Sequence, residues 1–175
     1  MPHPPRYDRL SVWLHWLMAA LLLAQWALGW WMTGIAKDGT GARAWWFNLH
    51  KSLGLVLLAL LALRLGWALL RPRVAALPQR PALQRLARGA HHALYALMLL
   101  VPLAGLLGSV FSGYPVRFFG LRLPLPGARW DAAKEWLSAA HHWSAWALLA
   151  LVSLHVAAFA HHQFVLRERL LQRMA

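Results

Sequence analysis

The 175-residue sequence contains no cysteine, and this absence excludes several kinds of site. Disulfide bonds, thiolate zinc sites, iron–sulfur clusters and covalent haem attachment through a C-x-x-C-H motif all require cysteine. Acidic residues are also scarce, since five Asp and Glu stand against eighteen Lys and Arg. The net charge of +13 is compatible with nucleic acid or with anionic lipid as a partner. The basic residues lie between long apolar runs, which fits membrane flanks better than a nucleic-acid-binding surface.

Apolar residues are what the sequence has in excess. Hydrophobic residues make up 60% of the chain and twelve residues are tryptophan, which is not the usage of a soluble domain. Four apolar runs are each long enough to cross a bilayer, which takes about 20 helical residues. These runs cover residues 10–33, 50–70, 91–111 and 138–164. The stretch MPHPPRYDRLS leads into the first run without the pattern of a cleavable signal, so a retained first span is expected.

The four runs predict an all-α integral membrane four-helix bundle, formed by one domain over residues 1–175. Pro102 lies inside the third run and predicts a kink that neighbouring helices tolerate. The fourth helix is expected to begin before residue 138, because DAAKEWLSAAHH is good helix sequence and Asp131 is placed as its N-cap.

The basic residues of the termini and loops, with Lys51 at the edge of the second run, predict the orientation of the bundle. Ten lie on the side that holds both termini: Arg6, Arg9, Arg71, Arg73, Arg80, Arg85, Arg88, Arg167, Arg169 and Arg173. Seven lie on the other side: Lys37, Arg43, Lys51, Arg117, Arg122, Arg129 and Lys134. Because an excess of Lys and Arg marks the cytoplasmic side, both termini are expected in the cytoplasm.

Four of the ten histidines fall at two depths of the predicted bilayer. His15 and His155 lie toward the cytoplasmic side, on the first and fourth spans. His50 and His141 lie toward the outer side, on the second and fourth spans. The fourteen residues from His141 to His155 correspond to about 21 Å and to about 40° less than four full turns, so both rings project from one helix face.

Neutral imidazole is a good ligand for haem iron, and bis-histidine ligation needs one ring from each of two helices. The depths therefore predict two haem b groups, held by His15 with His155 and by His50 with His141. A simpler interpretation, an interfacial polar residue, applies best to His3, His142 and His161. It applies less well to His155, which lies among Leu, Val and Ala, where polar groups commonly have a function. A histidine-lined metal transporter is a further alternative.

Successive blocks of the sequence resemble the bacterial cytochrome b-561 family of four-helix dihaem membrane proteins. The blocks are RYDRLSVWLHW, FNLHKSLGLVLL, RLGWALLRP, HALYALMLLVPLAG, RFFGLRLPLP and SLHVAAFAHHQF, in this order over nearly the whole chain. The resemblance implies a multi-pass protein of the bacterial inner membrane. It also implies the two haem-ligand pairs that depth alone suggests. Within the doublet at 141 and 142, the spacing to His155 favours His141, because His142 would point about 100° away.

The resemblance further implies a ubiquinone site on the cytoplasmic side. The matching residues are His91 and His162, each of which is one of a doublet with a neighbouring histidine. Imidazoles can hydrogen-bond the quinone carbonyls and relay the two protons that quinone reduction requires. Ser11 and Arg9, near the same edge, are weaker candidates for this site.

Some members of the family that this chain resembles are superoxide oxidases, which take one electron from each of two superoxide anions and pass both to ubiquinone. A basic outer surface would steer such an anion toward the outer haem. The candidate steering residues are Lys51, Arg117, Arg122, Arg129 and Lys134. The simpler interpretation is that these cations solvate the loops and bind lipid phosphate.

Two other functions stay open at this point. The chain could be a cytochrome b subunit that anchors a periplasmic dehydrogenase or hydrogenase, although such subunits often have extra spans or loop insertions. The alternative of a metal transporter is less favoured, because such proteins usually have carboxylates within their membrane spans and all five acidic residues of this sequence lie outside the four spans. A superoxide:ubiquinone oxidoreductase is therefore the favoured hypothesis.

Overall fold

The structure is a computed structural model that describes residues 6–71, 80–125, 127–168 and 170–174. It confirms an all-α four-helix membrane bundle. His3, Arg73 and Arg169 lie outside the described residues. The elements are α1 (Arg9–Thr33), α2 (Ala42–Leu70), α3 (Pro81–Val110), β1 (Arg117–Phe118), β2 (Leu121–Arg122), α4 (Asp131–Ala160), the π-helical η1 (His161–Val165) and the 3₁₀-helical η2 (Leu170–Arg173).

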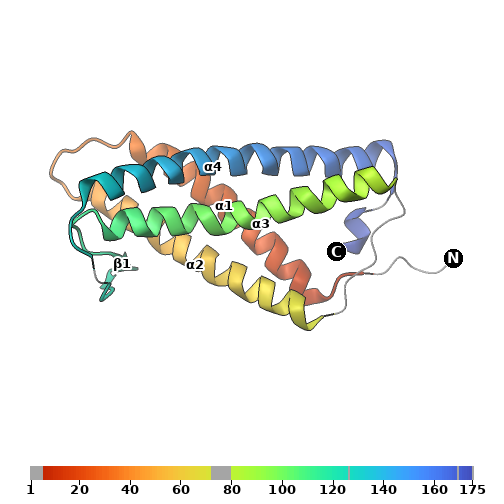
Figure 1. Cartoon of the computed structure of the whole chain (residues 1–175), viewed down its shortest axis with the longest axis horizontal. Coiled ribbons are helices and arrows are strands. Elements are labelled where there is room, and N and C mark those ends of the chain that lie inside the picture. The colour runs from red at the N-terminus through yellow and green to blue at the C-terminus, as the bar shows by residue number, and fades with distance from the viewer. Residues whose placement is uncertain (1–5, 72–79, 126, 169, 175) are drawn as a thin grey trace.

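The four long helices lie side by side, with α1 and α2 slanted relative to α3 and α4 (Figure 1). The start of α1, the start of α3, the end of α4 and η2 gather at one end of the bundle, here called the termini end (Figure 1). The opposite end carries the α1–α2 loop and the β1–β2 hairpin, and is called the hairpin end. The most extensive helix packing joins α3 to α4, and α1 to α2. The two ends correspond to the two depths at which the histidines were predicted.

Three helices begin earlier than the apolar runs predicted. The starts at Ala42, Pro81 and Asp131 precede the predicted residues 50, 91 and 138. Hydropathy marks only the part of a helix that faces lipid, whereas caps and turns fix where a helix begins. Gly41 has a φ of 81° immediately before α2, and Pro81 occupies the first turn of α3. The predicted span boundaries therefore understate the length of these helices.

The prediction of Asp131 as an N-cap was wrong by one residue. Trp130 is the residue that precedes the helix, and it makes no side-chain capping hydrogen bond. Asp131 lies within the first turn, where a carboxylate interacts favourably with the positive end of the helix dipole. Its Oδ1 accepts a hydrogen bond of 3.0 Å from Nε of Arg129. The helix nevertheless begins before residue 138, as expected.

All four helices are long and apolar enough to span a membrane, and only 11 to 17% of each most apolar 18-residue window is buried within the bundle. The buried core is correspondingly thin, with Met18, Leu57 and Leu61 at its centre. Lipid rather than protein must cover the remaining apolar surface, because so much exposed hydrocarbon would be unstable in water. The chain is therefore a multi-pass membrane protein. Helix α3 continues through Pro102.

Candidate functional site

At the hairpin end, the structure brings together the rings of His50 on α2 and His141 on α4. Their ring centroids are 6.0 Å apart and their planes are inclined by 88°. Sequence reasoning predicted this pair from depth alone. The two residues lie on different helices and 91 positions apart in the sequence, so only the packing of α2 near α4 brings their rings together. Their roles as iron ligands stay a prediction.

The ring of His141 is held in one orientation by α3. Its Nδ1 lies 2.8 Å from the backbone oxygen of Val101. A carbonyl oxygen can only accept, so Nδ1 carries the proton and Nε2 keeps its lone pair. Hydrogen bonding of one ring nitrogen to a backbone carbonyl is the usual support of a metal-binding histidine. Gly105 makes room for the ring, because a Cβ there would lie 2.9 Å from Nδ1.

His50 is positioned by α1. The Nε2 of Gln25, a buried residue of α1, donates a hydrogen bond of 2.8 Å to the backbone oxygen of His50. A Cβ at Gly29 would lie 3.1 Å from Cε1 of the His50 ring. The ring atom Nδ1 of His50 is buried and has no hydrogen-bond partner among the described residues. Sequence reasoning missed Gln25, although a lone polar residue in the middle of an apolar span was a visible signal.

These observations fit a haem iron between the two rings. One ring is oriented by a carbonyl, the other has an unsatisfied buried nitrogen, and a glycine leaves room beside each ring. Within the described part of the chain, no three His, Cys, Asp or Glu side chains are grouped so that they could hold a metal ion by themselves. A pair of facing imidazoles, such as His50 and His141, is a donor set that suits haem, whose porphyrin supplies the other iron ligands.

At the termini end, the ring of His155 on α4 lies beside His91 on α3, with centroids 5.5 Å apart and planes inclined by 77°. His15 on α1 makes an edge-to-face ring contact with its neighbour Trp16, with centroids 5.2 Å apart. His91 is fixed through Nδ1, which lies 2.8 Å from the backbone oxygen of Ala87. The structure thus sets the predicted ligand His155 against the predicted quinone residue His91, while the ring contact of His15 is with Trp16.

His162 lies in η1, just after the α-helical geometry of α4 ends at Ala160. The α-helical periodicity of 3.6 residues therefore does not extend from His155 to His162. Nδ1 of His162 lies 2.7 Å from Oε2 of Glu168. The chain turns back between them at Arg167, whose φ is 56°.

Ser11 has a structural role that competes with the predicted quinone contact. Its hydroxyl donates a hydrogen bond of 2.7 Å to Oδ2 of Asp8, and its backbone N–H donates to Oδ1 at 3.1 Å. Asp8 is thereby the N-cap of α1. The Ser11 hydroxyl oxygen keeps its two lone pairs and can still accept a hydrogen bond.

Arg64 on α2 is a second residue that sequence reasoning missed. Its Nε donates to Oη of Tyr95 at 3.2 Å, and its Nη1 donates to the backbone oxygen of Ser11 at 3.4 Å. A cation inside an apolar span is by itself a signal of function. The loop count of basic residues passed over Arg64 because it lies within a span.

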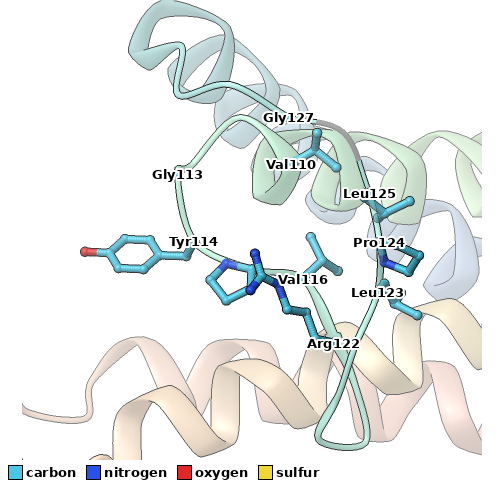
Figure 2. Close-up of a pocket in the computed structure, with 10 residues that line it drawn as sticks. Val110, Gly113, Tyr114, Val116, Arg122, Leu123, Pro124, Leu125 and Gly127 are labelled. Carbon is cyan, nitrogen blue, oxygen red and sulfur yellow. The ribbon is translucent and has the colours of Figure 1, made fainter.

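The predicted steering cations lie at the hairpin end, and four of them have exposed side chains: Arg117, Arg122, Arg129 and Lys134. Arg117 and Arg122 pair directly across the hairpin. Arg129 is partly neutralised by its ion pair with Asp131, and Lys51 is only partly exposed. Arg122 also reaches into a pocket of about 160 Å³ in the α3–α4 loop, whereas Tyr114 points away from it (Figure 2).

Comparison with known sequences decides the family. Residues 6–175 match the family model described as Prokaryotic cytochrome b561. The chain belongs to the prokaryotic cytochrome b561 family. It is 33% identical to cytochrome b561 homolog 2 of Escherichia coli K12, over 98% of this chain and 92% of that protein. It is 28% identical to cytochrome b562 of Cereibacter sphaeroides, over 99% of this chain and 98% of that protein.

Membership of the cytochrome b561 family gives the arrangement its chemistry. The protein is a membrane cytochrome, its cofactor is haem b, and its activity is haem-based electron transfer. The four apolar helices and the histidines that they bring together suit that activity. The number of haems, their ligands and the electron donor and acceptor go beyond the family assignment.

Proposed function

We propose that this cytochrome b561-family protein oxidises superoxide at its hairpin end and reduces ubiquinone at its termini end. Two superoxide anions each give up one electron and leave as O₂. One ubiquinone takes up the two electrons with two protons and becomes ubiquinol, so charge and atoms balance. The two ends of the bundle then perform different half-reactions, which suits the two separate groups of histidines.

His50 with His141, and His15 with His155, are the proposed ligands of two haem b groups. Haem b, when bound, supplies reversible one-electron redox chemistry. The protein's part is to hold the ligands at two depths and to fix their ring orientation. At the hairpin end, the backbone oxygen of Val101 fixes the ring of His141, whereas Gln25 holds the backbone of His50 through its hydrogen bond to the His50 carbonyl oxygen.

One observation carries the superoxide half of the proposal. Arg117 and Arg122 lie directly opposite each other in the hairpin, although facing like charges destabilise a strand pair. The hairpin is tied to α2 by Ser52, whose hydroxyl accepts a hydrogen bond of 2.8 Å from the backbone N–H of Phe119. Ser52 is fully buried and lies two residues after His50. The backbone of the hairpin is thus anchored to α2 two residues after a candidate haem ligand, and its exposed cations would attract a small anion to this end of the bundle.

The quinone half of the proposal uses His91 and His162, with Ser11 and Arg9 as weaker candidates. His91 has Nδ1 committed to the backbone oxygen of Ala87, so Nε2 donates a hydrogen bond to a quinone carbonyl when the ring carries both protons, and it can then pass its proton to the quinone. His162 is hydrogen-bonded to Glu168, so a carboxylate and an imidazole together can move a proton toward the site.

The proposed orientation places the termini end in the cytoplasm and the hairpin end in the periplasm of the bacterial inner membrane. The excess of Lys and Arg near the termini supports it. Superoxide would then be consumed outside the membrane, while the protons for quinone would be taken from the cytoplasm.

Stopped-flow mixing of superoxide with the purified, haem-loaded protein tests the proposal directly. We expect the haem absorption to show reduction within the mixing experiment, followed by reoxidation when a soluble ubiquinone analogue is added. The same experiment with superoxide dismutase present is the control. Failure of superoxide to reduce the haem, with reduction by dithionite intact, would favour a subunit that receives electrons from a periplasmic dehydrogenase or hydrogenase. Absence of bound haem after expression with excess haem would instead favour the hypothesis that the protein is a histidine-lined metal transporter.

A further inference from the structure

Arg64 is a cation placed within the apolar part of α2. It lies six residues before the end of the helix at Leu70, which is about 9 Å along the helix axis. A charged side chain at such a depth is costly, and it faces the bundle interior or a specific partner. The proposed haem-ligand and quinone sites do not include Arg64, so the function of its charge is still to be explained.

The guanidinium of Arg64 lies between three helices. It extends from α2 and donates hydrogen bonds to Oη of Tyr95 on α3 and to the backbone oxygen of Ser11 on α1. These contacts hold the half-buried side chain of Arg64 against both neighbouring helices. Both acceptors are uncharged, and they use two of the five N–H donors of the group.

No carboxylate side chain among the described residues pairs with Arg64. The five acidic residues of the sequence all lie in the described part of the chain. The ion pairs found there join Arg129 to Asp131 and His162 to Glu168. Asp8 accepts hydrogen bonds from Ser11 and from Nε1 of Trp67 instead. A half-buried cation whose two hydrogen-bond acceptors are both uncharged is suited to bind an anionic group.

The position of His15 indicates which anion this is. His15 lies one helical turn beyond Ser11 on the same face of α1, and Arg64 donates its hydrogen bond to the backbone oxygen of Ser11. Haem b carries two propionate carboxylates, and the planar guanidinium is suited to bind a carboxylate through two parallel hydrogen bonds. We propose that Arg64 binds a propionate carboxylate of the haem held by His15 and His155, and so raises the reduction potential of that haem. This inference rests on the proposed ligation by His15 and His155, and it does not depend on superoxide or ubiquinone as substrates.

The effect on the potential follows from charge. Reduction adds one electron to the haem, and a nearby cation favours the more negative state. Arg64→Gln is therefore expected to lower the midpoint potential of one haem and to leave the other unchanged. Arg64→Lys keeps the charge but loses the planar fork, and is expected to give a smaller shift. The measurement is an optical redox titration of the purified protein with both haems bound.

Tyr95→Phe is the matched control, because it removes one hydrogen-bond acceptor of Arg64 but leaves its charge in place. Both potentials are expected to stay at their wild-type values in this variant. Unchanged potentials in Arg64→Gln, with both haems retained, would overturn the proposal.

Two further variants keep the test decisive. If Arg64→Gln does not fold, resonance Raman spectra of Arg64→Lys report the propionate bending bands, and a shift in these bands for one haem is expected. Unshifted bands would overturn the assignment of Arg64. His15→Ala is measured in parallel and is expected to lose that same haem; retention of both haems would contradict the ligation on which the inference rests.

Discussion

Gly105 on α3 and His141 on α4 fit together so closely that a methyl group at position 105 would lie 2.9 Å from Nδ1 of the ring. Gly105→Ala is therefore expected to displace the ring and to break its hydrogen bond to the backbone oxygen of Val101. Overpacking of this kind costs about 1–3 kcal/mol. We expect the variant to lose the haem at the hairpin end and to keep the haem at the termini end. Haem content and low-temperature absorption spectra measure this loss.

Gly66→Ala provides the matched control for this variant. Gly66 also lies in a long helix, but a Cβ there would meet no atom within 4 Å. Its haem content and spectrum are expected to equal those of the wild type. Equal haem content in Gly105→Ala and Gly66→Ala would argue against His141 as a ligand.

His155→Ala is expected to lose the haem of the termini end and to abolish quinone reduction, while the haem of the hairpin end survives. His91→Ala tests the neighbouring ring, whose centroid lies 5.5 Å from that of His155. We expect it to retain both haems and to slow quinone reduction. Loss of a haem in His91→Ala, with both retained in His15→Ala, would make His91 the partner of His155. His142→Ala, at an exposed position, should behave as wild type.

His162→Ala is expected to keep both haems and to slow quinone reduction, because the candidate proton donor is removed. Glu168→Gln keeps an acceptor for Nδ1 of His162 but removes the negative charge. We expect it to slow the quinone step less than His162→Ala, with a changed dependence of the rate on pH. Pre-steady-state reoxidation of the reduced protein by a quinone analogue measures this rate. A rate equal to that of the wild type in His162→Ala would remove this residue from the quinone site.

Neutralising Arg117 and Arg122 together with Arg129 is expected to lower the association rate of superoxide and to flatten its dependence on ionic strength, since screening acts on exposed charges beyond about 10 Å at 0.1 M salt. Arg129→Gln alone is expected to have a smaller effect, because Asp131 already offsets its charge. Ser52→Ala detaches the hairpin from α2 and should lower the same rate without loss of charge. The measurement is the second-order rate constant of haem reduction by superoxide over a series of salt concentrations. If this rate constant depends on salt in the triple variant as it does in the wild type, the three arginines do not steer superoxide.

Asp8 gives a prediction for pH. The hydrogen bond from the Ser11 hydroxyl, with further ones from the Ser11 amide and Trp67, lowers the pKa of Asp8 from 3.8 to about 2. Because the pKa is lower in the folded protein, this contribution to stability is complete above pH 3.8 and is lost as pH falls toward 2. Asp8→Asn does not titrate, so its deficit in thermal stability relative to wild type is expected to shrink over that interval. A deficit that stays constant with pH, in thermal melts in detergent, would contradict the assignment. Asp8→Ala should cost about 1 kcal/mol at neutral pH, as loss of an N-cap usually does.

Much of the fold and part of the site could be predicted from particular residues. The apolar runs predicted four helices, and the fourteen residues between His141 and His155 predicted one face of α4. The helix starts at Ala42 and Pro81 were missed, because a turn or a proline sets them and hydropathy does not. The π-helical turn at His161 was also missed. Nothing in a periodic apolar pattern marks where hydrogen bonding changes from one helical register to another.

The sequence by itself determined that the protein is a membrane bundle with histidines at two depths, because the distance along a helix and the direction of a side chain follow from its periodicity. Only the tertiary structure decided which side chains meet. It set His50 against His141, placed His91 beside His155, tied the hairpin to α2 through Ser52, and left Arg64 between Tyr95 and the Ser11 carbonyl. These contacts join segments far apart in the chain, and their distances depend on how neighbouring helices pack, which periodicity within a single helix does not contain.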